Sequence, residues 1–135
     1  MPDDRLTWSP GGAAGTPLAL AGRLADFLGF FSHLVTERTV PERPSEPPPA
    51  PASRDEAKAK VAGAFDRLTK VIENVSQADL PQQIPVPWGG TMPLGELIHG
   101  SSGIVSYFQG QLNYLQLCYG DTDPNMPPEW GHGGN

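Results

Sequence analysis

Proline placement is the feature of this sequence that most restricts its fold. Six prolines fall within residues 41–51, and residues 77–90 hold three more together with the Gly89-Gly90 pair. Proline lacks a backbone N–H and clashes with the preceding helical turn, so neither a helix nor a central strand persists at that density. Regular structure is therefore expected only in the longer stretches on either side of these two segments.

Apolar residues recur at helical spacing in each of those stretches. The predicted helices span residues 17–37, 54–76 and 91–119. Thr16-Pro17 is typical of a helix start, because threonine supplies a capping oxygen and proline needs no N–H at the first helical position. Ser53-Arg-Asp-Glu56 matches the capping-box pattern, Thr91-Met-Pro93 repeats the threonine–proline start, and Gly120 is a natural C-terminal stop. With no plausible strand, the pattern predicts an all-α bundle of three long helices.

The other segments are predicted to be irregular parts of a single domain covering residues 1–135, since a chain of 135 residues fits one domain. Residues 41–53 form a proline-rich connector with polyproline character. A plain linker is favoured there over a recognition motif for a proline-binding domain. Residues 121–135 are expected to form an irregular tail, which Trp130 could pin to the domain.

Composition excludes several functional classes. The net charge of −6 and the pI near 4.8 oppose binding to phosphate backbones, so no nucleic-acid partner is expected. A single cysteine rules out an internal disulfide framework. Residues 18–35, the most apolar stretch, are interrupted by Arg23, Asp26 and His33, and the acidic N-terminus does not resemble a secretory signal. We therefore expect a cytoplasmic protein without a membrane partner.

Few residues offer metal-binding or catalytic chemistry. Glu96 and His99 form one Glu-x-x-His step on a helix face, whereas di-iron bundles need two such steps and two further glutamates. His33 and His99 are the candidate ligands of a rearranged metal site, although packing or capping is the commoner role of such histidines. Cys118 lies on the predicted apolar face and is expected to be a buried structural thiol.

Small residues are concentrated on two of the predicted helices. Gly22 and Gly29 lie seven residues apart, as do Gly103 and Gly110, and Gly100-Ser-Ser-Gly103 removes side-chain bulk from one face. We expect a neighbouring helix to pack closely against these positions. The alternative is a pocket that opens beside them.

The stretch Phe108-Gln-Gly-Gln-Leu-Asn-Tyr-Leu-Gln-Leu-Cys-Tyr-Gly-Asp121 resembles the last helix of the DinB/YfiT-like superfamily. The matching residues are Gly110-Gln111, Asn113, Tyr114, Gln116 and Gly120-Asp121. Pro87–Leu94 is similar to the family's loop before that helix, and Asp4–Pro10 is similar to its lead into the second helix. The resemblance covers residues 4–130 in patches and is most specific over 107–121.

This resemblance implies an up-down four-helix bundle with one nickel or zinc ion held by three histidines. It also implies a metal-dependent thiol transferase or isomerase activity with a small thiol cofactor. The family's ligand positions fall on Arg23, Ile104 and Phe108, none of which can serve as the metal-binding histidine, so we expect neither metal nor cofactor. The resemblance then leaves an apolar ligand pocket lined by Arg23, Phe27, Ile104, Phe108 and Gln111. Arg23 would bind an anion there, pair with a carboxylate or extend to solvent, and the last two are favoured.

The resemblance also implies a further helix before Asp4. Without it, the three predicted helices would expose an apolar groove of a size that is unusual for a monomer. An upstream coding start, a second chain forming a homodimer, or the segment around Trp8 would each cover the groove. The first two explanations are favoured, and the sequence does not choose between them.

We therefore interpret the chain as a DinB-like bundle with a degenerate metal site, which is non-catalytic or binds an unknown small molecule. One alternative is a metal-dependent thiol transferase or hydrolase with a rearranged site at His33 and His99. The other is a protein-interaction module that uses the exposed helical groove.

Overall fold

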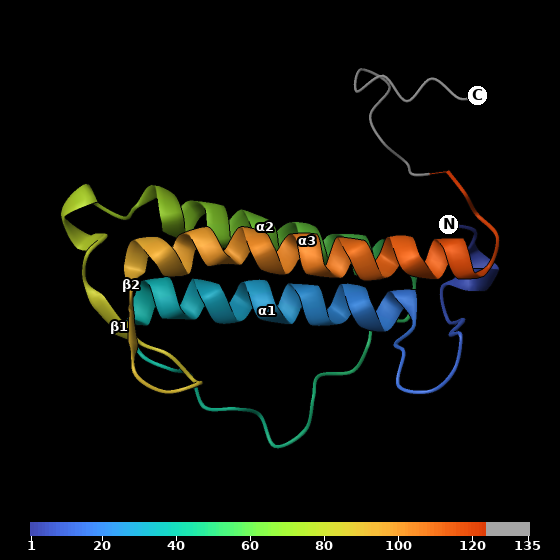
Figure 1. Cartoon of the computed structure of the whole chain (residues 1–135), viewed down its shortest axis with the longest axis horizontal. Coiled ribbons are helices and arrows are strands. Elements are labelled where there is room, and N and C mark those ends of the chain that lie inside the picture. Colours follow the sequence, from blue (N-terminus) through green and yellow to red (C-terminus); the bar gives the residue numbers. More distant parts are fainter. Residues whose placement is uncertain (124–135) are drawn as a thin grey trace.

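A computed structural model describes residues 1–123 of the chain. Three long helices dominate it: α1 (Pro17–Glu37), α2 (Arg54–Glu73) and α3 (Leu94–Cys118) (Figure 1). The short elements are the 3-10 turns η1 (Asp3–Arg5) and η2 (Gln77–Asp79) and the strands β1 (Gln83–Pro85) and β2 (Thr91–Pro93). The all-α bundle of three long helices that the sequence predicted is confirmed. The tail beyond residue 123, including Trp130, lies outside the described residues.

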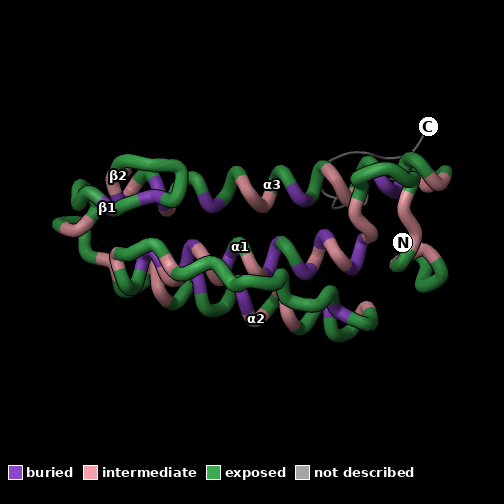
Figure 2. The backbone as a smooth tube through the Cα atoms, turned by 90° about the horizontal axis from the view of Figure 1, so that it is seen from below, coloured by how far each residue is buried: buried purple, intermediate pink, exposed green. Residues whose placement is uncertain are grey.

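The central helix of the bundle is α1, which packs against both α2 and α3 (Figure 2). The proline-rich connector returns along the length of the bundle, so α1 and α2 run in the same direction and α3 runs opposite to both (Figure 1). The helix directions therefore do not simply alternate along the chain. Lys60 Nζ on α2 lies 3.0 Å from Asp26 Oδ1 on α1 and pairs the two parallel helices.

Helix α1 begins and ends where its sequence signals predict. Thr16 Oγ1 accepts a hydrogen bond of 3.2 Å from the Ala19 N–H, and Pro17 occupies the first helical position. The helix ends at Glu37, because Arg38 adopts a left-handed conformation (φ 59°) and its N–H bonds back to the Leu34 carbonyl. A left-handed residue at this position satisfies a carbonyl at the helix end.

The capping box predicted for α2 forms only in part. Ser53 Oγ accepts a hydrogen bond of 3.2 Å from the Glu56 N–H, as the pattern requires. Glu56 Oε2 instead accepts from the Ala52 N–H, at 2.7 Å, rather than from the Ser53 N–H. At its other end α2 stops at Glu73, three residues before the predicted position, and Asn74 caps it.

A short hairpin replaces the predicted start of the third helix. Strands β1 and β2 pair antiparallel with Ile84 opposite Met92, so Thr91 belongs to a strand and caps no helix. Its hydroxyl donates to Gln83 Oε1 at 3.0 Å, and α3 begins at Leu94 without a side-chain cap. Gly89 and Gly90 have positive φ values of 99° and 78°, which let the chain reverse tightly.

One hydrophobic cluster joins the three helices and the hairpin. Its largest fully buried side chains, each at most 1% exposed, are Leu20, Leu28, Leu34, Ile84, Leu94 and Leu97. Buried positions recur along the facing sides of α1 and α3 (Figure 2). The burial of Ile84 explains why the hairpin forms: it closes one end of the apolar core.

Within residues 1–123, α1 is the one helix long and apolar enough to cross a membrane by length and composition. Its charged residues alone therefore do not exclude a span, contrary to the sequence argument. The core helix of a bundle meets the same criterion, and 56% of the most apolar window of α1 is buried inside this one.

The predicted close helix contacts at small residues do not form. A Cβ atom at Gly22 would lie 2.9 Å from Pro51 Cδ, so the residue that approaches Gly22 belongs to the connector, not to a helix. Gly29, Gly103 and Gly110 have no atom of the described chain within 4 Å of such a Cβ. The hydroxyls of Ser101 and Ser102 donate to the Ile98 and His99 carbonyls of their own helix. Gly100, Gly103 and Gly110 of α3 face open space, and Gly110 lines the groove described below, so the alternative of a pocket holds at that position.

Candidate functional site: a groove beside α3

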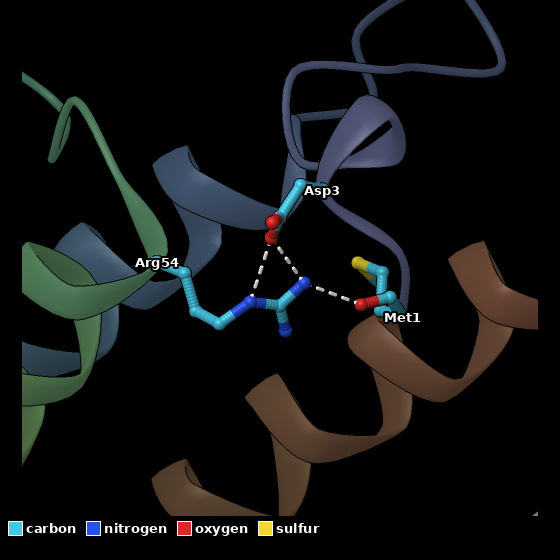
Figure 3. A network of polar contacts seen from close by, with 3 residues as sticks. All are labelled: Met1, Asp3 and Arg54. Carbon is cyan, nitrogen blue, oxygen red and sulfur yellow. Dashed lines mark hydrogen bonds and ion pairs between the residues drawn. The ribbon is translucent and has the colours of Figure 1, made fainter.

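The N-terminal segment is fastened to the start of α2. Arg54 Nε and Nη2 donate to Asp3 Oδ1 at 2.8 and 2.6 Å, and Nη2 also donates to the Met1 carbonyl at 2.6 Å (Figure 3). Charge-assisted hydrogen bonds of this kind are among the stronger polar contacts in proteins.

The same segment also contacts the end of α3. The Trp8 ring meets Tyr119 edge-on with 5.8 Å between centroids, and the Arg5 guanidinium lies 5.8 Å from the Tyr119 ring centre. The Tyr119 hydroxyl is buried and has no hydrogen-bond partner among residues 1–123, and burial raises the pKa of this tyrosine. Segments 1–8, the start of α2 and the end of α3 therefore form one junction.

The motif at the end of α3 builds a helix stop. Gly120 has φ 93° and donates to the Leu117 carbonyl at 3.1 Å, and the Asp121 N–H donates to the Gln116 carbonyl at 3.0 Å. This pair of bonds is the common left-handed C-terminal cap. The buried Gln116 side chain adds a third bond, from Nε2 to Asp121 Oδ2 at 3.1 Å. Gln116, Gly120 and Asp121 thus have a structural role here.

The hydrogen bonds of this cap predict a lowered pKa for the Asp121 carboxyl group. The Gln116 amide and then the Asp123 N–H donate to the Asp121 carboxylate and lower its pKa below the ordinary aspartate value. A lowered pKa means that the stabilisation is present above the unfolded-state pKa and is lost as pH falls through the folded one. We expect NMR titration to show the lowered value, and Gln116→Leu to return it towards normal. An unchanged pKa in that variant would contradict the assigned cause.

A shallow groove lies between the start of α1 and the middle of α3. Its volume is about 320 Å³, and its lining residues are Ala14, Gly15, Leu20, Tyr107, Gly110, Gln111, Tyr114 and Leu115. Tyr107 and Tyr114 are each 63% exposed and stand two helical turns apart, with Gly110 and Gln111 between them. None of the lining side chains carries a charge at neutral pH. The groove therefore offers aromatic faces, an amide and open space over a glycine.

The five pocket residues predicted from the resemblance do not share one cavity. Gln111 lines the groove, and Phe27 touches the buried Phe108 with 5.7 Å between ring centroids. Ile104 packs half-buried against the core. Arg23 is exposed, and its guanidinium lies against Gly15 at the rim of the groove, where a Cβ atom would collide with it. Arg23 therefore lies at the surface, whereas Phe108 is buried in the core.

Sequence reasoning missed the two tyrosines that define the groove. Positions 107, 110, 111 and 114 follow the i, i+3, i+4, i+7 spacing of one helix face. That face lies beside the apolar stripe from which the core was predicted, and a search for buried residues does not single it out. A second periodic stripe of aromatic and small residues was the available signal.

The candidate metal ligands do not assemble into a cluster. His33, half-buried near the end of α1, has Nε2 3.4 Å from Thr39 Oγ1, and His99 is exposed in the second turn of α3. Across residues 1–123, no group of three or more histidine, cysteine, aspartate or glutamate side chains is placed to hold a metal ion. Cys118 is exposed, contrary to the prediction of a buried thiol, because the buried positions near the end of α3 are Leu115 and Gln116 and the position of Cys118 faces outward.

The three-helix fold places this protein in a class, the DinB-like helical bundles. The sequence profile of the DinB superfamily matches residues 1–100, and this chain belongs to that superfamily. The match ends before residues 107–121, the stretch on which the sequence resemblance chiefly rested.

A solved structure supports the same fold. The crystal structure of a DinB-like protein from Bacillus subtilis, determined at 2.30 Å resolution, superposes with a TM-score of 0.62 at 9% sequence identity. The alignment covers 86% of this chain and 77% of the other. At that identity the likeness concerns the fold alone. No curated protein matches the sequence.

Proposed function

We propose that this DinB-like protein has lost the histidine metal site of its family and binds a small, uncharged, largely apolar molecule in the groove beside α3. The observation that carries the proposal is the groove itself. Two exposed tyrosines and the Gln111 amide line it without a charged side chain. Binding sites with this make-up hold a ligand through aromatic contact and orient it through a few polar groups.

The loss of the metal site is supported by two side chains on α3. Phe108 is 2% exposed and packs on Phe27, and Ile104 packs against the core. Hydrocarbon side chains at these two positions occupy the space that metal-binding histidines would need. Neither side chain has a lone pair that could bind a metal.

The same groove supports a non-catalytic role. Its lining lacks a carboxylate, a histidine, a lysine and a thiol, which are the groups that usually act as acid, base or nucleophile. We expect a cytoplasmic binding protein. The competing possibility, a thiol transferase or hydrolase with a metal held at His33 and His99, is decided by the metal measurement below.

Two measurements test this function. Protein from cells supplied with nickel and zinc should contain only traces of metal by mass spectrometry. Near-stoichiometric metal that His99→Ala removes would overturn the proposal in favour of the metalloenzyme.

A binding experiment tests the groove directly. Indole, an uncharged aromatic probe, should shift the NMR signals of Tyr107 and Tyr114, and the cationic probe benzylammonium, which the Arg23 guanidinium at the rim repels, should shift them less. Tyr107→Ala should weaken the indole response, whereas Trp88→Ala should leave it unchanged, since Trp88 is a matched aromatic (64% exposed) outside the groove. Equal responses to the two probes, or none, would contradict the assigned ligand class.

A further inference from the structure

The most exposed large apolar side chains within residues 1–123 are Trp88, at 64%, and Tyr107 and Tyr114, at 63% each. The two tyrosines stand in the groove beside α3, and Gly110 lies between them with no atom within 4 Å of a Cβ built there. The described chain therefore leaves two aromatic side chains and an open space uncovered on one helix face. Exposed apolar surface that is gathered in this way marks an interaction site.

The groove has the size and spacing for one flat ring. Its volume of about 320 Å³ lies at the lower end of the range for ligand pockets, roughly 300–1,000 Å³. Tyr107 and Tyr114 are seven residues apart, or about 10.5 Å along the helix axis. A ring midway between them lies about 5 Å from each along that axis, a separation at which aromatic rings attract one another. The Gln111 amide beside them has an oxygen that can accept a hydrogen bond from an indole N–H.

The chain itself carries such a ring close to the groove. Trp130 follows Asp123, the last described residue, by seven positions, and seven extended residues span about 23–25 Å. Gly110 lies eight residues before Cys118, where α3 ends, which is about 12 Å along the helix axis. Trp130 can therefore reach the groove by turning back along α3, with chain to spare.

The third exposed aromatic side chain is a poorer match for Trp130. Helix α3 has 25 residues and is about 37 Å long. Trp88 belongs to the hairpin at the end of the bundle where α3 begins, and most of that length separates it from the end of α3 (Figure 1). The tyrosine groove is therefore the aromatic surface that lies within the reach of Trp130.

Tethering and charge favour the chain's own tail as the occupant. A segment joined to its site by a short linker has an effective concentration of about 1 mM, so that even a weak contact is populated. Glu129 precedes Trp130, and the exposed Arg23 guanidinium at the groove rim forms no ion pair within residues 1–123. Pro127 and Pro128 fix two φ angles just before them, which reduces the entropy lost on docking.

We propose that residues 124–130 turn back along α3 and place the Trp130 ring between Tyr107 and Tyr114 of the same molecule. The Glu129 carboxylate then faces Arg23, and the tail occupies the groove until a ligand displaces it. This inference rests on the groove of the proposed function and adds its regulation, because the small ligand competes with a side chain of the protein itself.

Contacts between the rings test the docking directly. NMR of the full chain without ligand should show nuclear Overhauser effects from the Trp130 ring to the rings of Tyr107 and Tyr114. Trp130→Ala should shift both tyrosine signals, whereas the matched control Trp88→Ala should leave them unchanged. Tyrosine signals that do not respond to Trp130→Ala would overturn the proposal. So would ring contacts that form only between labelled and unlabelled copies in a mixed sample, because the occupant would then be a second molecule.

Indole titration tests the competition, since indole is the ring of the Trp130 side chain. If the tail occupies the groove in three of four molecules, removing its ring raises the apparent affinity for indole about fourfold. We therefore expect Trp130→Ala to bind indole several-fold more tightly than the unaltered chain, and Trp88→Ala to bind it like the unaltered chain. Equal affinities of Trp130→Ala and the unaltered chain would contradict the competition.

The docked tail and the small-molecule function fail separately. If the ring contacts form but indole shifts neither tyrosine signal even in Trp130→Ala, the small-molecule function fails and the docked tail stands. If indole binds equally well with and without Trp130 and the ring contacts are missing, the docked tail fails and the small-molecule function stands.

Discussion

Truncation of Leu28 to alanine should lower the free energy of unfolding by about 2–5 kcal/mol. Leu28 is 0% exposed and belongs to the single hydrophobic cluster of the bundle. It lies on α1, the helix that contacts both neighbours, so a cavity there would weaken both helix pairs at once. Urea unfolding should show a lower midpoint with an unchanged slope, since the native contacts elsewhere persist.

The matched control is Leu117→Ala on α3. Leu117 is 59% exposed, so its truncation should change the unfolding free energy by no more than about 0.5 kcal/mol. A loss at Leu117 as large as that at Leu28 would mean that the exposed side of α3 is covered in solution. Equal and small losses would contradict the central position of α1.

Leucine substitutions at Gly22 and Gly29 should have opposite effects. Gly22→Leu should destabilise by about 1–3 kcal/mol, because a side chain there meets the rigid ring of Pro51. Gly29→Leu should stabilise by up to about 1 kcal/mol, because nothing lies within 4 Å and leucine is the better helix former. Thermal unfolding of both variants measures the difference.

Comparing the two variants separates the effect of helix propensity on stability from the effect of the contact with the connector. Both variants make the same chemical change seven residues apart on α1, so their difference reports the surroundings of the two glycines. If Gly22→Leu is stabilising, the connector does not rest on α1 at Pro51.

Local signals in the sequence predicted the helices well. The predicted and observed limits of α1 coincide, and its start follows from a capping threonine and a first-position proline that act within a few residues. Gly120 ends α3 for a similarly local reason. Each of these features depends on neighbours along the chain and not on the rest of the bundle.

The hairpin was missed because its cause is not local. Gln83–Pro85 and Thr91–Pro93 are three-residue strands, too short for an alternating pattern, and two prolines within them argue against a strand. They pair because Ile84 and Leu94 are buried at the end of a core that other segments build. Thr91 therefore pairs within the hairpin, although the sequence around it resembles a helix start.

The candidate site was only partly predictable. Of the five expected pocket residues, Gln111 lines the groove and Arg23 lies exposed at its rim. A resemblance to a family predicts which positions of this chain correspond to the family's site. The direction in which each side chain points also depends on how the helices pack. The stripe that holds Tyr107 and Tyr114 could be read from the sequence, but only the structure shows that both side chains are exposed beside a groove.

The amino-acid sequence was enough to predict the number of long helices, the Thr16 and Ser53 caps of α1 and α2, the proline-rich connector and the acidic character of the chain. These follow from backbone sterics, from hydrogen bonding within a turn or two, and from a sum of charges. The tertiary structure alone decided that α1 and α2 run parallel, that Pro51 meets Gly22, and that Tyr107 and Tyr114 face a groove. Those features depend on contacts between residues far apart in the sequence. These contacts form only when the apolar faces of the three helices pack together.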